Sequence, residues 1–133
     1  MRVVIAGSRR IPPRISYPLI VDAVQKFETT HGGITEVVSG AEPTGVDRQG
    51  ETWAEANVVP CRQFPFVQGR GRAGGPIRNS EMAAYAEGLI LVCQLGADGR
   101  PATPGSADML KKAEAQAKKR PFPIVIRAIE ATQ

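Results

Sequence analysis

The residues best suited to chemistry cluster between Gly74 and Met82, where the chain reads GGPIRNSEM. The two glycines let backbone N–H groups approach a ligand closely, and Pro76 is preset for the first turn of a helix. Free N–H groups in such a turn favour an anion, and the guanidinium of Arg78 fits a phosphate or a carboxylate. Asn79 offers a donor and an acceptor to a sugar hydroxyl or a base edge. The alternative is an ordinary loop that enters a helix, with Arg78 in solvent.

The elements that must position this stretch alternate between short apolar strands and amphipathic helices. The predicted strands lie near 2–6, 36–39, 61–64, 89–93 and 124–126, and the predicted helices near 16–31, 45–57, 77–87 and 106–119. This alternation predicts an α/β fold, a single Rossmann-like three-layer domain with a mainly parallel sheet of about five strands. The long irregular stretch from Pro65 to Gly75 is a candidate lid or subunit contact.

Length and composition favour one domain. The 133 residues, 42% of them hydrophobic, suffice for one buried core and are too few for two ordinary domains. We expect a single domain over 1–133, with a core at 1–127 and a C-terminal tail at 128–133. No apolar run is long enough to cross a bilayer and the start does not resemble a signal peptide, so we expect a cytoplasmic protein without membrane contact.

The net charge and the positions of the cysteines limit the classes of ligand that the sequence predicts. The formal charge of +4 favours anionic ligands, whether nucleotides or nucleic acid, but aromatic residues make up only 5% of the chain. Cys61 and Cys93 lie in apolar segments and form no CxxC pair, which predicts buried reduced thiols. With His31 in a polar turn, the sequence predicts neither a metal site nor a cofactor.

Glycine-bearing loops are predicted at the carboxyl ends of four strands, where parallel α/β sheets bind ligands. The candidate ligand-binding residues in these loops are Gly7, Ser8, Arg9, Ser39, Gly40, Gly45, Asp47, Gly74, Gly75, Pro76, Arg78, Asn79, Gly105 and Ser106. Because these loops share one edge of the sheet, we expect them to converge on an anionic, nucleotide-sized ligand.

Each polar candidate also has a purely structural interpretation. Ser8 and Arg9 fit a turn and a surface arginine, or a site for phosphate oxygens. Asp47 fits dipole stabilisation in a first helical turn, or contact with a ribose hydroxyl or an anomeric carbon. Ser106 is either an N-cap or part of a phosphate cradle, and Glu81 either a surface residue or an acid that faces the cleft. The sequence leaves these alternatives open.

The motifs together resemble a known superfamily. They are Gly7-Ser8-Arg9, Ser39-Gly40 with Gly45-Val46-Asp47, and Gly75-Pro76-Ile77-Arg78-Asn79 with Met82 and Tyr85. In this order they resemble the SLOG superfamily of Rossmann-like domains, and most closely its YspA or cpYpsA-related group. The resemblance implies a nucleotide or nucleotide-derived ligand, bound by a sensor or ligand-binding protein, and self-association into a homo-oligomer, a dimer or higher.

Two relatives in the superfamily imply alternative activities. LOG-type phosphoribohydrolases cleave the N-glycosidic bond of a nucleoside monophosphate with an arginine that resembles Arg78 and with a glutamate. Here Met109 takes the glutamate's position and Asp108 precedes it, so a LOG-like hydrolase would use Arg78 with Asp108, Asp47 or Glu81.

The second relative is DprA, which binds single-stranded DNA and carries a segment similar to Pro76–Asn79. That resemblance implies a single-stranded nucleic acid partner. The small number of aromatic residues available for base stacking argues against this alternative.

Overall fold

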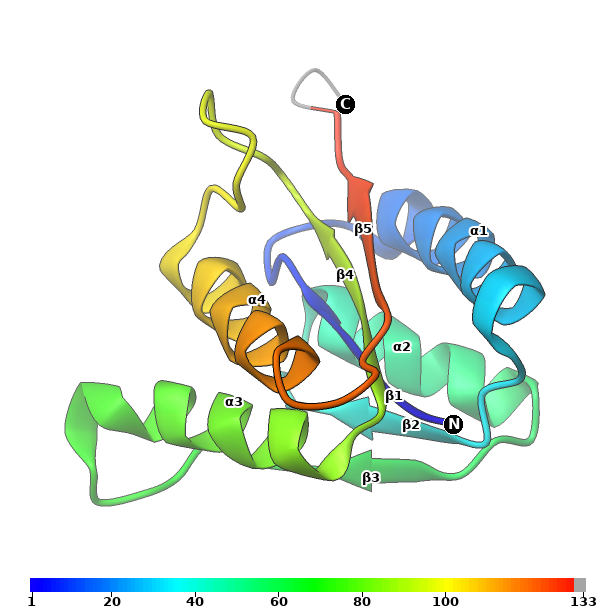
Figure 1. The fold of residues 1–133 in the computed structure, drawn as a ribbon. Helices are drawn as coiled ribbons and strands as arrows, with labels where there is room; N and C mark the ends of the chain where they lie inside the picture. Colours follow the sequence, from blue (N-terminus) through cyan, green and yellow to red (C-terminus); the bar gives the residue numbers. More distant parts are fainter. Residues whose placement is uncertain (131–133) are drawn as a thin grey trace.

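Five parallel strands form the central sheet in the computed structural model, which describes residues 1–130 (Figure 1). The strands are β1 (Arg2–Gly7), β2 (Glu36–Ser39), β3 (Cys61–Gln63), β4 (Gly88–Cys93) and β5 (Ile124–Ala128). They pair in the order β3-β2-β1-β4-β5. The chain runs outward from β1 to β3 and then returns to β4 on the other side of β1. The topological switch point, where such sheets bind ligands, therefore lies between β1 and β4.

Helices cover both faces of the sheet in the described part of the chain (Figure 1). The helices are α1 (Pro13–His31), α2 (Gly45–Ala56), α3 (Gly74–Tyr85) and α4 (Pro104–Ala117), with a short 3-10 helix η1 (Gly71–Ala73) before α3. Apolar side chains of α1 and α2 pack on one face of the sheet, and those of α3 and α4 pack on the other. The predicted three-layer α/β fold is confirmed.

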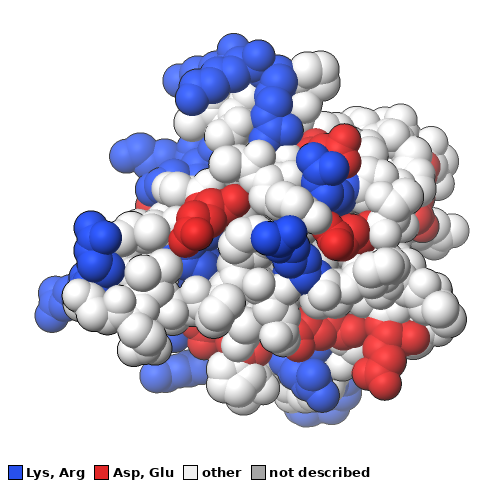
Figure 2. Space-filling view, turned by 90° about the horizontal axis from the view of Figure 1, so that it is seen from below, with Lys and Arg blue, Asp and Glu red and all other residues white. Residues whose placement is uncertain are grey.

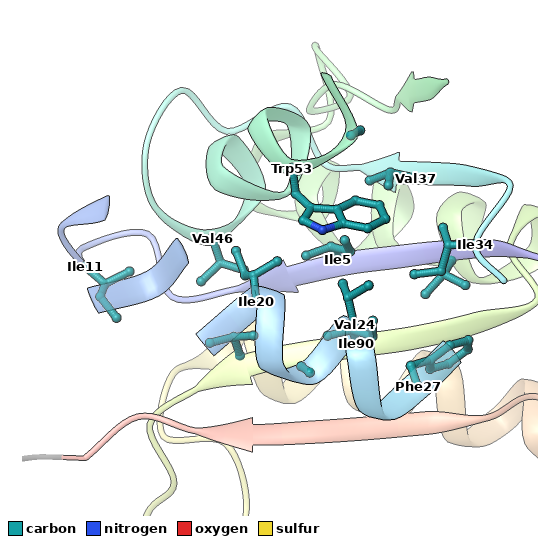
Figure 3. Close-up of a cluster of buried hydrophobic side chains, with 14 of the residues drawn as sticks. Ile5, Ile11, Ile20, Val24, Phe27, Ile34, Val37, Val46, Trp53 and Ile90 are labelled. Atoms are coloured by element: carbon teal, nitrogen blue, oxygen red, sulfur yellow. The ribbon is translucent and has the colours of Figure 1, made fainter. Parts of the chain in front are cut away.

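The core is divided between the two faces because successive side chains of a strand point to opposite sides. On the α1–α2 face, Trp53 points from α2 toward Ile5 and Val37 of the sheet (Figure 3). On the other face, Met82 of α3 and Met109 of α4 belong to a second buried cluster. β4 is buried along its whole length, as its continuous apolar run predicts for a strand covered on both sides.

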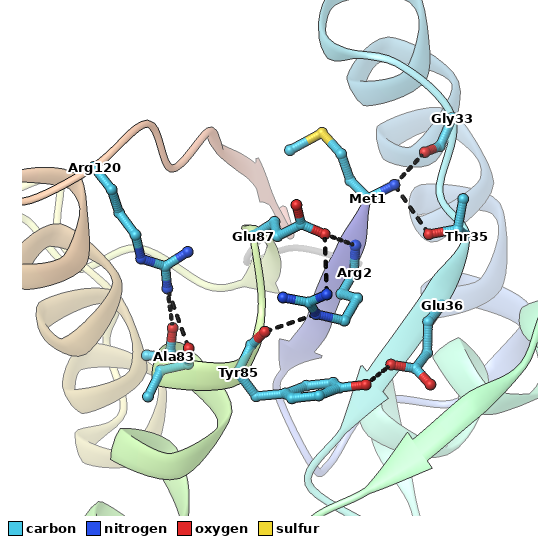
Figure 4. A network of polar contacts seen from close by, with 10 residues as sticks. Met1, Arg2, Gly33, Thr35, Glu36, Ala83, Tyr85, Glu87 and Arg120 are labelled. Carbon is cyan, nitrogen blue, oxygen red and sulfur yellow. Dashed lines mark hydrogen bonds and ion pairs between the residues drawn. The ribbon is translucent and has the colours of Figure 1, made fainter.

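Polar contacts close the amino ends of the strands (Figure 4). The Arg2 backbone N–H donates to Glu87 Oε1 at 2.9 Å, and Arg2 Nε donates to the Tyr85 carbonyl at 2.9 Å. Arg120 Nη2 donates to the Ala83 carbonyl at 2.7 Å. We call this set, completed by the hydrogen bond from the Tyr85 hydroxyl to Glu36, the amino-edge network. Its two arginines bind carbonyls in the last turn of α3, which a helix cannot satisfy internally.

Three helices begin earlier than predicted. α1 starts at Pro13 and α4 at Pro104, because a proline needs no hydrogen-bond acceptor in a first turn and its φ already suits a helix. Ser16, at the predicted start of α1, is buried inside this helix, and its hydroxyl donates to the Pro12 carbonyl at 3.4 Å. α3 starts at Gly74 instead of Ile77, because η1 runs directly into it. The loop before α3 is correspondingly shorter than predicted.

Two further expectations were wrong in detail. Cys61 is exposed instead of buried, because β3 is an edge strand whose residues are all exposed, whereas Cys93 is buried as predicted. β5 continues to Ala128, and Ile129 is buried, with its N–H donating to the Cys93 carbonyl at 2.9 Å. Residues 128 and 129, which the prediction placed in a C-terminal tail at 128–133, therefore belong to the folded core, and residues 131–133 lie outside the described part.

Candidate functional site

A cleft of about 1060 Å³ opens at the carboxyl ends of β1 and β4, beside the topological switch point. Its wall comprises the loop that follows β1, the first turns of α3 and α4, and the chain that follows β5. A volume near 1,000 Å³ is at the upper end for sites that hold small molecules and cofactors. The predicted convergence of loops at this edge thus produces a hollow large enough for a nucleotide.

The structure brings most of the predicted ligand-binding residues together. Those that line the cleft are Gly7, Ser8, Arg9, Asp47, Gly75, Pro76, Arg78, Asn79, Gly105 and Ser106. The lining does not include Ser39, Gly40, Gly45 or Gly74. Glu81, predicted as an acid for the hydrolase alternative, is exposed and also lies outside the lining.

Arg78 is a largely buried cation in the cleft wall, with a side chain only 11% exposed. Its Nη1 donates to the Gly40 carbonyl at 2.6 Å, and its Nε donates to Asn79 Oδ1 at 3.0 Å. Its Nη2 lies 4.0 Å from Glu42 Oε1. A guanidinium carries five N–H donors, so these contacts fix its plane and leave donors for a ligand. Arg78 is therefore preorganised to bind an anionic or carbonyl oxygen.

Glycines outside the lining make this geometry possible. A Cβ on Gly40 would lie 2.7 Å from both Arg78 Nη1 and Asp47 Oδ2, too close for either side chain to keep its position. A Cβ on Gly45, whose φ is +74°, would lie 2.3 Å from the Ser8 carbonyl oxygen. Gly45 thus lets the start of α2 pack against the loop after β1. Gly40 and Gly45 affect the cleft indirectly, because the absence of a side chain at each position allows the residues of its wall to pack closely.

Asp47 is a buried acid in the first turn of α2, only 7% exposed. Its Oδ2 accepts the Glu42 backbone N–H at 3.4 Å. Burial raises the pKa of Asp47 from 3.8 to about 7, although the Arg78 charge and this hydrogen bond act in the opposite direction. Acids that titrate near neutrality in a cleft are suited to proton transfer or to hydrogen bonding with a ligand hydroxyl.

Asp108 belongs to a closed set of contacts between α3 and α4. Asn79 Nδ2 donates to its Oδ2 at 2.9 Å, and Lys112 Nζ donates to its Oδ1 at 2.7 Å. Since a cation and an amide already hold both carboxylate oxygens, Asp108 is a positioning residue for Asn79. Met109, also in the lining, is 2% exposed and packs in the core.

The two helix starts at the cleft differ in the donors that they offer. In α3 the Gly74 N–H donates to the Gly71 carbonyl and Pro76 has no N–H, so neither of these residues offers a backbone donor to an anion. In α4 the N–H groups of Gly105 and Ser106 lie in the first turn, where a helix supplies no acceptor. A Cβ on Gly105 would meet nothing within 4 Å, so space is open beside these donors. Ser106 is the third residue of α4 and not its N-cap.

Sequence reasoning missed Glu42, which lines the cleft between Arg78 and Arg9, 3.8 Å from Arg9 Nη1. The signal available was its place between two glycines of a loop already singled out. It also missed Phe66, an aromatic residue in the glycine-rich loop before α3. Neither residue belongs to a recognisable motif, so only the packing of the loops reveals their position.

The cleft contains charges of both signs. Its lining includes Arg9, Arg10, Arg72, Arg78, Glu42, Asp47, Asp108 and Glu130. Basic and acidic side chains are also interspersed on the surface in Figure 2. The lining is therefore not the uniformly basic groove that is the usual footprint for a nucleic acid backbone. The described residues contain no group of three or more His, Cys, Asp or Glu that could hold a metal ion.

Residues 1–66 match the protein-family model YAcAr, described as the YspA, cpYpsA-related SLOG family. This segment belongs to the SLOG family. It contains Gly7–Arg9 and Gly40–Asp47, two of the motifs on which the resemblance was based, and so confirms it. The SLOG match ends before Gly75–Asn79, whose resemblance stays a prediction. A comparison with curated proteins gave no match.

Membership of this SLOG family suggests a nucleotide-related ligand and no more specific activity. The structure adds that, among the described residues, none of the helices combines the length and the apolar character needed to cross a membrane.

Proposed function

We propose that the protein binds a nucleotide or nucleotide-derived small molecule in this cleft, as a sensor or ligand-binding protein. The observation that carries the proposal is the buried Arg78, held by the Gly40 carbonyl and Asn79 in a cleft of nucleotide size. A cation kept this far from water needs an anion or a strong acceptor beside it. The nearest side-chain carboxylate contact for Arg78, at 4.0 Å from Glu42, is long for this purpose.

In this proposal the parts of the cleft bind different parts of the ligand. The N–H groups of Gly105 and Ser106, the Ser106 hydroxyl and the Ser8–Arg9 loop bind phosphate oxygens. Asp47 and Glu42 accept hydrogen bonds from the O–H groups of the ribose. The mixed charge of the lining supports a polar ligand with few charges over a polyanion.

The test is native mass spectrometry of protein purified without added ligand, followed by calorimetric titration with a panel of nucleoside mono- and diphosphates. We expect at least one nucleotide to bind, and Arg78→Ala to weaken it about 10- to 100-fold, the effect of losing a charged hydrogen bond. Arg48→Ala is the matched control, because Arg48 is exposed and outside the lining. The same spectra report whether the chain forms the homo-oligomer that we also propose.

Equal binding by the two variants would place the ligand elsewhere, and the absence of any nucleotide complex at millimolar concentration would refute the proposal. Circular dichroism of Arg78→Ala, compared with Arg78→Lys, separates lost binding from lost folding. Single-stranded DNA belongs in the same panel, since DprA-like binding would weaken steeply as salt rises.

A second candidate is hydrolysis of the N-glycosidic bond of a nucleoside monophosphate. It is favoured by Asp47, whose pKa of about 7 suits a general acid or base at neutral pH. The test is release of free base from nucleoside monophosphates, measured by chromatography. Release that Asp47→Asn abolishes while nucleotide binding persists would establish the enzyme, and no release at high protein concentration would leave the binding function alone.

A further inference from the structure

Of the aromatic side chains in the described part of the chain, only Phe66 lines the cleft. Phe66 is 42% exposed, whereas Met82 of α3 and Met109 of α4, which also line the cleft, are each 2% exposed. It lies in the loop between β3 and η1, and it shares the lining of the cleft with charged residues and with aliphatic ones such as Ile11 and Ile15. In the described part of the chain, Phe66 is therefore the one aromatic surface that the cleft offers to a ligand.

The Phe66 ring packs against the first turn of α3, at Gly74 and Gly75. A Cβ on Gly74 would lie 2.5 Å from Phe66 Cε1 and 2.4 Å from the Val67 carbonyl oxygen. A Cβ on Gly75 would lie 3.7 Å from Phe66 Cε2, an ordinary contact. The absence of a side chain at Gly74 therefore lets the outer edge of the ring rest against the first turn of α3. The ring packs along that edge on α3, and Phe66 also lines the cleft.

The Phe66 ring packs on α3, the helix that carries Arg78. Gly74, against which the ring packs, precedes Arg78 by four residues, which places the two about 6 Å apart along α3 and on the same side of it. Gly75 and Arg78 both line the cleft. An aromatic ring and a cation that line the same cleft match a molecule that carries a planar group at one end of a sugar and an anionic or polar group at the other.

We propose that Phe66 stacks on the base of the bound nucleotide, so that the cleft selects ligands with a planar heterocycle over sugar phosphates that lack one. This inference rests on the proposed function and adds to it the residue that reads the base. Stacking of a base on an aromatic side chain tolerates different bases, because every base has a π-face. Phe66 thus accounts for selection of nucleotides as a class, and polar residues elsewhere in the lining must choose among bases.

The test compares AMP, GMP, CMP and UMP with ribose 5-phosphate by calorimetric titration of the wild type, Phe66→Ala, Phe66→Leu and Phe66→Tyr. We expect Phe66→Ala to weaken the best nucleotide roughly 5- to 100-fold, the range measured when a stacking aromatic is removed. Ribose 5-phosphate should bind all four proteins within a factor of two. Phe66→Tyr, which keeps the ring, should retain nucleotide affinity.

Phe66→Leu distinguishes stacking from packing, because leucine can fill the space against Gly74 but has no π-face. Nucleotide affinity lost in both the leucine and the alanine variant, with ribose 5-phosphate unchanged, supports stacking. Equal weakening of both kinds of ligand, or wild-type affinity in Phe66→Leu, overturns it, since the ring would then only hold α3. A wild type that binds neither kind of ligand refutes the proposed function and this inference together.

A spectroscopic version uses Phe66→Trp. The natural Trp53 is 7% exposed and packs in the core on the α1–α2 face, so its emission should not respond to ligands. The introduced indole should be quenched by a stacked base and unaffected by ribose 5-phosphate. Quenching of similar size by both ligands would contradict stacking.

Discussion

The two edges of the sheet use the same side-chain types in different ways. At the carboxyl edge, Arg78 donates to the Gly40 carbonyl, as Arg120 donates to the Ala83 carbonyl in the amino-edge network. The amino-edge arginines bind carbonyls at the end of α3, and Arg2 has Glu87 as a partner. At the carboxyl edge, Arg78 faces a cleft of about 1060 Å³. The arginines of the amino edge therefore have partners within the protein, whereas Arg78 at the carboxyl edge keeps N–H donors available to a ligand.

The acids of the two edges show the difference most clearly. The Arg2 backbone N–H, followed by the Arg2 charge, lowers the pKa of Glu87, so the folded protein favours its ionised form. Burial raises the pKa of Asp47 to about 7, so the folded protein opposes its ionised form. A carboxyl group buried in this way destabilises the fold when it is ionised, and pKa shifts of this kind concentrate at functional sites. The comparison supports the carboxyl edge as the site of function.

The largest effect that would break this comparison concerns Asp47. Its pKa is about 7 in the folded protein against an ordinary value of 3.8, so its contribution to stability is full below pH 3.8 and is lost as pH rises through 7. Asp47→Asn should remove this dependence and raise the free energy of unfolding at pH 8 by an amount on the order of a few kcal/mol. Urea unfolding from pH 4 to pH 8 measures it.

An Asp47→Asn variant less stable than the wild type at pH 8 would mean that Arg78 stabilises ionised Asp47 more than burial penalises it. The fold would then favour the ionised acid at both edges, and the argument that the cleft contains a destabilised carboxylate would fail.

A smaller effect concerns the glycines of the carboxyl edge. Gly40→Ala puts a Cβ 2.7 Å from Arg78 Nη1 and Asp47 Oδ2, and should lower the free energy of unfolding by about 1–3 kcal/mol, as overpacking does. Gly105→Ala, in the first turn of α4, meets no atom within 4 Å and should leave stability unchanged or raise it by up to about 1 kcal/mol. Thermal unfolding of the pair measures both, and equal stabilities would show that Arg78 and Asp47 can move aside freely.

The smallest effect sharpens the comparison at the amino edge. Glu87 has a lowered pKa, so its contribution to stability is present above the ordinary value of 4.5 and is lost as pH falls through the folded value. Glu87→Gln should lower stability at pH 7 by less than about 1 kcal/mol, because its side chain is 41% exposed and water screens the Arg2 pair. The pH dependence should have the sign opposite to that of Asp47, and urea titrations at pH 3 and pH 7 test this.

Much of the fold followed from patterns local in the chain. β2 at Glu36–Ser39 and the start of α2 at Gly45 were predicted to the residue, because an apolar run and a glycine-marked turn bound them. The convergence of Ser8, Asp47, Arg78 and Ser106 was also predictable, since parallel strands bring their carboxyl ends to one edge. Helix starts were less accurate, because the predicted starts near 16 and 106 left Pro13 and Pro104 in the preceding loops, although a proline suits a first turn.

What the sequence by itself determined is therefore the order of elements, the three-layer arrangement and the edge at which function is to be sought. Tertiary structure alone decided that Asp47 is buried, that Glu81 lies outside the cleft lining, and that Phe66 packs on Gly74. The reason is physical: strand and helix periodicity act between near neighbours in the chain, whereas burial and side-chain contact depend on loops that meet only after the sheet has formed.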